Sequence, residues 1–173
     1  VVSANDGGEE ALLVLALALC HTTLIDDSAG AGAAPTDVAA SKIGDPFVDD
    51  PDVLRLDYAG DSPDEVALVR AAKRLGVAMT ARRGALVQLK LAGAGAPEGG
   101  AAAVHREREY EVLETIPFSS ARKRMSTLVR TPDGRLVLFT KGADDVMLAE
   151  ARRSAVAAGK DAGESGAGAM GDA

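Results

Sequence analysis

Three short segments combine residue types that could bind a ligand: "SPDE" at 62–65, "PFSSARKRM" at 117–125 and "TKGAD" at 140–144. Aromatic residues make up only 3% of the chain, so a Phe near a strand end stands out, because its ring can stack on a planar ligand. A Lys followed by Gly-Ala offers an ammonium group beside backbone that a ligand can approach closely.

Phe118 and Lys141 each have a simpler interpretation when position alone is considered. Phe118 follows Pro117, where we expect a strand to break, so the ring is free to leave the core; the alternative is an ordinary core Phe. Lys141 ends an expected hairpin strand, and its ammonium could meet phosphate oxygens; the alternative is a solvated surface charge.

Glu65 lies in the first turn of the helix that the sequence predicts most strongly, at 63–75. Ser62 has the properties of an N-cap, Pro63 suits the first helical position, and Glu65 stands where a capping box places its acidic residue. Gly76 suits a left-handed helix stop. A capping box would account for Glu65 as a structural residue.

The remaining periodicity predicts an α+β fold, with an antiparallel β-sheet flanked on one side by helices. The apolar stretch at 11–20 is too short to span a bilayer, which takes about 20 residues, and is expected to be a buried helix. A last short helix should run from 144 to about 150. The expected strands are 77–82, 85–91, 110–118, 124–130 and 135–141, the last two joined through Pro132-Asp133-Gly134.

Length and composition favour one compact domain at 1–150. The chain has 173 residues, a net charge of −7 and a pI near 4.8, which does not suit a nucleic-acid partner. Gly- and Ala-rich loops are expected near 26–50 and 92–106, and a flexible Gly/Ala-rich tail at 151–173.

Several chemical sites are excluded or disfavoured. The sequence contains no P-loop motif, and the match to G-x-G-x-x-G at 166–171 has neither a strand before it nor a helix after it, so we treat it as chance. Cys20 is the single cysteine, and together with His21 and His105 it forms no plausible metal-ligand cluster, so these residues are interpreted as a helix end and a surface residue. We expect no metal site in this chain.

Four spaced segments together resemble the nucleotide-binding domain of P-type ATPases, and within them the phospholipid-transporting type IV group, the flippases. These segments are "ALCHTTL", "YAGDSPDEVALVRAAKRLG", "IPFSSARKRMS" and "FTKGADDVM", and the resemblance covers roughly residues 11–150. It implies that ATP is the ligand, that Phe118 stacks on adenine, that Glu65 contacts the adenine amino group, and that Lys141 and Gly142 line the pocket. It places Ser120 and Met125 near the same pocket, whereas the basic residues at 122–124 alternate along a strand and cannot all face ATP.

The resemblance also implies that this domain works as part of a longer membrane protein, and the chain begins with Val1 rather than Met. The sequence lacks the Asp-Lys-Thr-Gly phosphorylation motif, the magnesium-binding aspartates, the actuator loop and transmembrane helices, so no catalytic residue is assigned and the chain alone should not hydrolyse ATP. The Mg²⁺ ligands are expected in the phosphorylation domain. The expected partners are the phosphorylation and actuator domains, with phospholipid reached only through the membrane domain, and the expected location is cytosolic, on an integral membrane protein.

Two alternatives remain open at the level of sequence. The first is the same domain in a cation-transporting P-type ATPase. The second is a degenerate interaction module that no longer binds nucleotide, because the arginine-bearing Gly-Leu-Arg-type segment of flippase domains cannot be assigned in the tail after Glu150.

Overall fold

The computed structural model describes residues 8–26, 46–47, 49–93 and 105–157. Most of the two loops expected near 26–50 and 92–106 lies outside the described residues. The G-x-G-x-x-G match at 166–171 and the end of the expected tail lie outside them as well.

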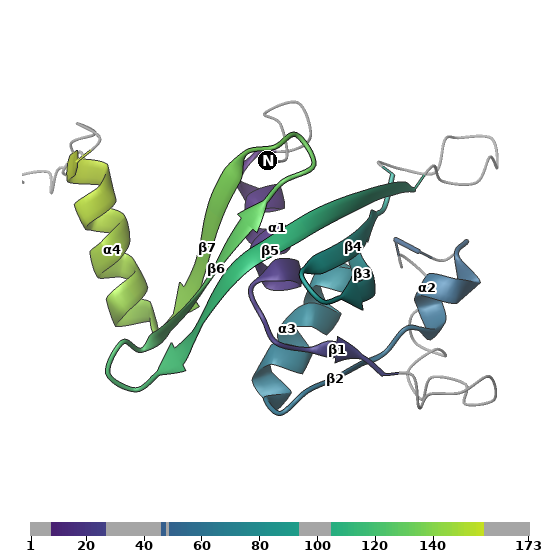
Figure 1. The fold of residues 1–173 in the computed structure, drawn as a ribbon, viewed down its shortest axis with the longest axis horizontal. Helices are drawn as coiled ribbons and strands as arrows, with labels where there is room; N and C mark the ends of the chain where they lie inside the picture. Colours follow the sequence, from purple (N-terminus) through teal and green to yellow (C-terminus); the bar gives the residue numbers. More distant parts are fainter. Residues whose placement is uncertain (1–7, 27–45, 48, 94–104, 158–173) are drawn as a thin grey trace, which may run out of the picture.

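A five-stranded antiparallel sheet organises the fold, and its strand order follows the chain (Figure 1). The longest strand, β5, pairs with β4 along its first half and with β6 along its second half. This confirms the expected α+β class with an antiparallel sheet. The strands are β3 (Val77–Arg83), β4 (Leu86–Leu91), β5 (Arg106–Ser119), β6 (Arg124–Arg130) and β7 (Leu136–Gly142).

Helices α1 (Glu9–Leu19) and α3 (Pro63–Arg74) pack against each other and against β3. In the sequence between α1 and α3, the chain forms three small elements that the sequence analysis did not predict. These are helix α2 (Pro51–Arg55) and strands β1 (Leu24–Ile25) and β2 (Tyr58–Ala59), which pair antiparallel. No helix in the described ranges is both long and apolar enough to cross a membrane.

Helix α4 (Asp144–Ala157) differs from the expectation in length and position. It continues to Ala157 instead of ending near Glu150, so the first part of the expected flexible tail is helical. It also stands apart from α1 and α3, beyond the end of β7, rather than on one side of the sheet with them (Figure 1). Two ion pairs from its first turns, Lys123–Asp145 and Arg124–Glu150, hold it to the β5–β6 turn and to the start of β6.

The structure confirms the turn signals and the Ser62 N-cap. The Ser62 hydroxyl accepts a hydrogen bond from the Glu65 N–H at 3.4 Å, and Gly76 ends α3 with a φ of +90°. Gly134, with a φ of +84°, closes the β6–β7 hairpin by donating to the Thr131 carbonyl at 2.8 Å. Each glycine occupies the left-handed region that other residues avoid.

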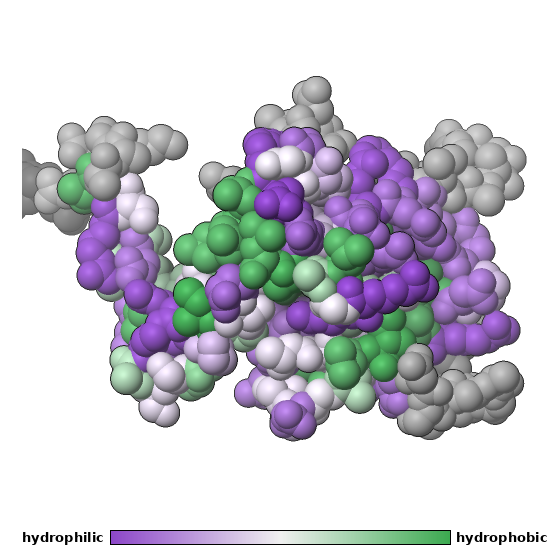
Figure 2. All heavy atoms as spheres, in the orientation of Figure 1, coloured by the Kyte–Doolittle hydropathy of each residue, from purple (hydrophilic) through white to green (hydrophobic). Residues whose placement is uncertain are grey.

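The two faces of the sheet differ in character. The inner face, which meets α1 and α3, carries Met125, Thr127 and Val129 of β6, all buried. The outer face carries Leu136 and Leu138 of β7, which are 60% and 59% exposed, and Figure 2 shows an apolar surface gathered over this part of the sheet. The core lies between the inner face and the two helices. It is built mainly from aliphatic residues, including Leu15, Leu19, Val69, Met79, Leu89 and Val129.

His21 is fully buried at the end of α1, where its ring holds the backbone that follows. Its Nε2 lies 2.9 Å from the Ala18 carbonyl, and its Nδ1 accepts a hydrogen bond from the Thr23 N–H at 3.0 Å. The ring is therefore the neutral tautomer with its proton on Nε2. Burial, assisted by the charges of Arg82 and Lys141, lowers the pKa of His21 to about 4 against the opposing effect of the Ala18 carbonyl.

This burial makes folding stability depend on pH in a defined window. Because the unfolded chain takes up a proton on His21 near pH 6.5 and the folded chain only near pH 4, stability contributed by the neutral ring should be present above about pH 6.5 and lost as the pH falls toward 4. The loss should total roughly 3 kcal/mol in urea unfolding free energy. Imidazole resonances of His21 that titrate near pH 6.5 in the folded protein would contradict this.

Candidate ligand-binding site

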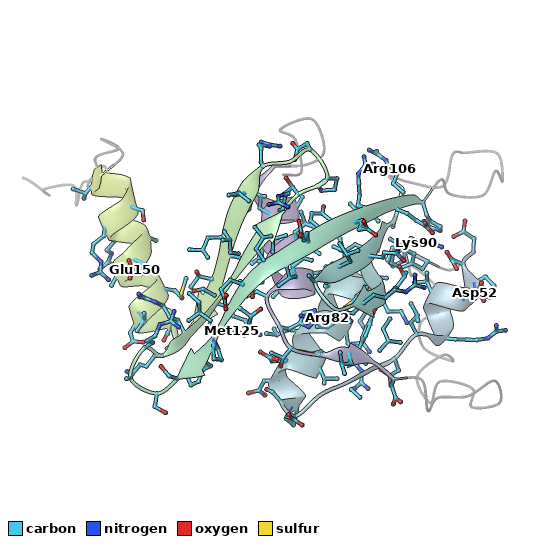
Figure 3. The ribbon with its side chains drawn as sticks, in the orientation of Figure 1. Asp52, Arg82, Lys90, Arg106, Met125 and Glu150 are labelled. Atoms are coloured by element: carbon cyan, nitrogen blue, oxygen red, sulfur yellow. The ribbon has the colours of Figure 1, made fainter. Side chains whose placement is uncertain are left out.

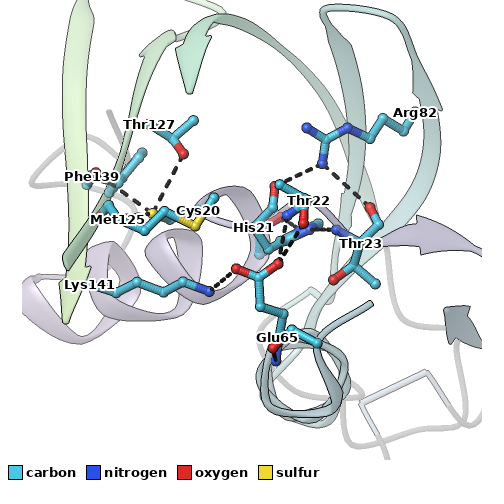
Figure 4. Close-up of polar contacts among 12 residues, drawn as sticks. Cys20, His21, Thr22, Thr23, Glu65, Arg82, Met125, Thr127, Phe139 and Lys141 are labelled. Atoms are coloured by element: carbon cyan, nitrogen blue, oxygen red, sulfur yellow. Dashed lines mark hydrogen bonds and ion pairs between the residues drawn. The ribbon is translucent and has the colours of Figure 1, made fainter. Parts of the chain in front are cut away.

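Two residues predicted to contact a ligand, Glu65 and Lys141, are brought together by the fold (Figure 4). The Lys141 Nζ donates to the Glu65 Oε1 at 3.0 Å, which joins the first turn of α3 to the end of β7. Their side chains are 15% (Glu65) and 24% (Lys141) exposed, so the pair lies at the edge of the interior and can still be reached from solvent. Side by side, the carboxylate can accept a hydrogen bond from one edge of a ligand while the ammonium group donates one to the same edge.

Thr22 completes the surroundings of the Glu65 carboxylate. The Thr22 N–H and hydroxyl both donate to Glu65 Oε2, at 2.9 and 2.8 Å. A capping box would also have the Glu65 carboxylate accept a hydrogen bond from the Ser62 N–H, and this part of the expectation is wrong. Within the described residues, the carboxylate accepts its hydrogen bonds from Thr22 and Lys141. The Ser62 hydroxyl alone caps α3, because the side chain of Glu65 turns away from its own helix.

These donors stabilise the charged form of Glu65. Partial burial pushes the pKa of its carboxyl upward, but the Thr22 N–H, the Lys141 ammonium and the Thr22 hydroxyl outweigh that effect and hold the pKa below its ordinary value. The carboxylate is consequently ionised at neutral pH and available as a strong hydrogen-bond acceptor.

The interior next to this cluster contains Cys20, Met125, Thr127 and Phe139, which Figure 4 shows above Lys141 and Glu65. The Thr127 hydroxyl donates to the Cys20 sulfur at 3.5 Å, and that sulfur lies 3.8 Å from the Phe139 carbonyl oxygen. Burial raises the pKa of the Cys20 thiol. Met125 is 2% exposed and pairs with Lys141 across the β6–β7 ladder, so it belongs to the core next to the site.

Phe118 projects from the sheet, with 61% of its surface exposed. The strand does not break at Pro117, as the sequence analysis expected; β5 continues to Ser119, and the pairing with β6 shifts between Ile116 and Ser119. Such an irregularity re-aims side chains without ending the strand. Because β6 alone separates β5 from β7, Phe118 lies roughly 10 Å from the strand that carries Lys141.

The glycine of the Lys-Gly-Ala step is required by the protein itself. A Cβ on Gly142 would come within 2.5 Å of the Lys123 carbonyl oxygen and 2.9 Å of the Arg124 Cα. Gly142 therefore allows the β5–β6 turn to approach β7, which is a different reason from the ligand approach expected from sequence. Lys123 itself adopts a φ of +50° in this turn.

The expectation that the basic residues at 122–124 alternate along a strand is wrong, because Arg122 and Lys123 lie in the turn and only Arg124 belongs to β6. Arg124 and Lys123 pair with Glu150 and Asp145 of α4, and Figure 3 shows Met125 among the strands and Glu150 on the separate helix. Arg122 donates to neutral oxygens, the Pro117 carbonyl at 3.4 Å and the Ser126 hydroxyl at 3.5 Å. Ser120 is exposed in the same turn.

No group of three or more His, Cys, Asp or Glu side chains in the described ranges is arranged to hold a metal ion. Cys20 and His21 are buried at the end of α1, as a structural helix end would be. The interpretation of His105 as a surface residue is wrong, because its side chain is 11% exposed, its Nε2 contacts Asp49 at 2.9 Å, and its ring packs against Phe47 with centroids 5.2 Å apart.

The fold and this cluster define an α+β domain with a polar, solvent-accessible site at the edge of an antiparallel sheet. A sequence profile described as "P-type ATPase, cytoplasmic domain N" matches residues 49–163. The chain belongs to this family, which confirms the resemblance found in the sequence.

The individual relatives carry the names of lipid transporters. The chain is 34% identical over 140 residues to phospholipid-transporting ATPase DNF1 of Chaetomium thermophilum. The aligned segment covers 81% of the chain and 7% of the relative. Over 76% of the chain it is 35% identical to human phospholipid-transporting ATPase IC, and over 83% it is 35% identical to phospholipid-transporting ATPase dnf2 of Schizosaccharomyces pombe. It spans 8% of each of these two relatives.

Sequence reasoning missed Thr22 as a site residue. Thr22 is separated from Glu65 by 43 positions, and nothing local in "CHTT" indicates which threonine faces the carboxylate. The available signal was the burial expected of the preceding apolar helix, which places its end near the core.

The exposure of Phe118 predicts a contrast between two Phe-to-Ala substitutions. Phe118→Ala should change the unfolding free energy by less than about 1 kcal/mol, because an exposed ring leaves no cavity when it is removed. Phe139→Ala, at a residue only 7% exposed, should cost about 3–5 kcal/mol. Urea unfolding of both variants measures this, and a large loss for Phe118→Ala would place its ring in the core.

Proposed function

We propose that this chain is the ATP-binding domain of a phospholipid-translocating P-type ATPase and that it presents the ATP γ-phosphate to an aspartate on a separate phosphorylation domain. The observation that carries the proposal is the ion-paired Glu65 carboxylate and Lys141 ammonium at the sheet edge. The exposed ring of Phe118 near the same end of the sheet supports it.

The pair has the hydrogen-bonding character that an adenine edge requires. On the edge formed by N6 and N7, adenine offers an amino group that donates and a ring nitrogen that accepts, whereas guanine presents two acceptors there, O6 and N7. Glu65 accepts and Lys141 donates, so together they match adenine, and the carboxylate disfavours the guanine carbonyl. Phe118 supplies an exposed face on which the base can stack, a contact worth roughly 1–3 kcal/mol in other settings.

This geometry changes the role that we propose for Lys141. The adenine amino group and the phosphates lie at opposite ends of the nucleotide, while Glu65 and Lys141 are 3.0 Å apart. We therefore assign both residues to the adenine end, with Lys141 donating to a ring nitrogen rather than to the phosphates. We include Ser120 because it lies in the turn that follows Phe118, Gly142 because it packs against that turn, and Met125 because it pairs with Lys141 across the β6–β7 ladder.

The relatives' names support the proposed parent class, an integral membrane translocase in which this domain is cytosolic. In that parent the Mg²⁺ ligands and the phosphorylated aspartate belong to the phosphorylation domain, and phospholipid is moved by the membrane domain. The cation-transporting alternative keeps the same site in this chain. The degenerate module differs in that it binds no nucleotide.

Titration of the chain with ATP tests the proposal, and Glu65→Gln makes the test specific. An amide oxygen accepts a hydrogen bond less strongly than a carboxylate and its NH₂ can turn toward a carbonyl, so ATP affinity should fall roughly five- to tenfold and the preference over GTP should shrink. Calorimetry and NMR shift perturbation measure both.

Asp64→Asn is the matched control, because it removes the same charge from the neighbouring, exposed residue. It should leave ATP affinity and the ATP-to-GTP ratio unchanged. Absence of any perturbation around Phe118 and Lys141 at millimolar ATP in the wild-type chain would favour the interaction module.

Lys141→Met tests the assignment of the lysine to the adenine end. If the ammonium contacts the base, adenosine and ATP should lose affinity by similar factors, whereas a phosphate contact would weaken ATP alone. Lys90→Met is the control. Lys90 is also an ion-paired lysine, with its Nζ 2.7 Å from Asp50 Oδ2, but it lies away from the site. A loss of affinity for ATP but not for adenosine would show that Lys141 contacts the phosphates instead.

A further inference from the structure

Thr22 is held in place on both sides of its backbone. The Arg82 Nη1 lies 3.1 Å from the His21 carbonyl oxygen and 3.4 Å from that of Thr23, the residues that flank Thr22. The buried His21 ring also accepts from the Thr23 N–H. The backbone at Thr22 is therefore fixed by β3 and by the end of α1, independently of Glu65 (Figure 4).

The two oxygens of the Glu65 carboxylate have different partners. Thr22 supplies both of the hydrogen bonds to Oε2, from its N–H at 2.9 Å and its hydroxyl at 2.8 Å, whereas Lys141 donates to Oε1. Oε2 is thus engaged by the fixed backbone, and Oε1 faces the lysine with a lone pair to spare. This arrangement sets both the position and the rotation of the carboxylate.

We propose that Thr22 is a positioning residue of this site, whose hydroxyl orients the Glu65 carboxylate so that Oε1 is directed at the ligand. The inference rests on the proposed function for its meaning, but the contact itself can be tested without a nucleotide. Thr22 contacts no ligand in this proposal and acts through Glu65.

The chain offers a matched control next to Thr22. The Thr23 hydroxyl is buried and has no hydrogen-bond partner among the described residues. Thr22→Val and Thr23→Val therefore remove the same group from adjacent positions, and only the first removes a hydrogen bond to Glu65. Thr22→Ser restores the hydroxyl and is the rescue variant, while Thr22→Ala is a second variant without it.

The first measurement is the Glu65 carboxyl titration followed by carbon-detected NMR, with no nucleotide present. Loss of one donor to the carboxylate should raise the pKa of Glu65 in Thr22→Val and Thr22→Ala, because the charged form is less stabilised. Thr22→Ser and Thr23→Val should titrate as the wild type does. An unchanged titration in both hydroxyl-free variants would overturn the proposal.

The second measurement is the affinity for ATP and GTP. Thr22→Val should bind ATP roughly three- to tenfold more weakly and discriminate less between the two nucleotides, with recovery in Thr22→Ser. If Thr22→Val and Thr22→Ala both bind ATP and GTP as the wild type does, then Thr22 does not position the Glu65 carboxylate. If the wild type binds no nucleotide, the proposed function fails, and the Glu65 titration alone decides whether Thr22 orients the carboxylate.

Discussion

The Glu65 carboxylate is the contact on which the arrangement of the site depends. It receives hydrogen bonds from Thr22, which follows α1, and from Lys141 at the end of β7, while its own backbone begins α3. One ionised group thus joins two helices and a sheet strand at the rim of the core. Because a carboxylate taken from water requires compensating donors, both Thr22 and Lys141 must be in place for Glu65 to stay ionised at this position.

If Glu65 binds adenine as proposed, its structural role and its binding role compete. In the absence of a ligand, its charge is balanced by the ammonium at 3.0 Å. A base that enters must share these two groups rather than displace them, because removal of either would leave the other partly buried without a partner. Thr22 lessens the conflict, since it holds one carboxylate oxygen and leaves the second to be shared.

Local signals in the sequence were sufficient for much of the fold. Ser62 and Gly76 set the ends of α3, and Gly134 sets the β6–β7 hairpin, because each acts on backbone within a few residues. The site was only partly predictable, since the family resemblance implied that Glu65 and Lys141 contact a ligand but nothing in the sequence indicated their contact with each other. The burial of His105 and the close approach at Gly142 depend on partners distant in sequence, and no periodic pattern encodes these.

The separation of the partners along the chain has a consequence for how the domain folds. Glu65 and Lys141 are 76 residues apart, and the buried contacts of Cys20 with Met125 and Phe139 span 105 and 119 residues. Contacts of this span close large loops and form slowly. During synthesis α1 and α3 leave the ribosome well before β7, so the site is assembled only when the last hairpin docks, and an intact site marks a completely folded domain.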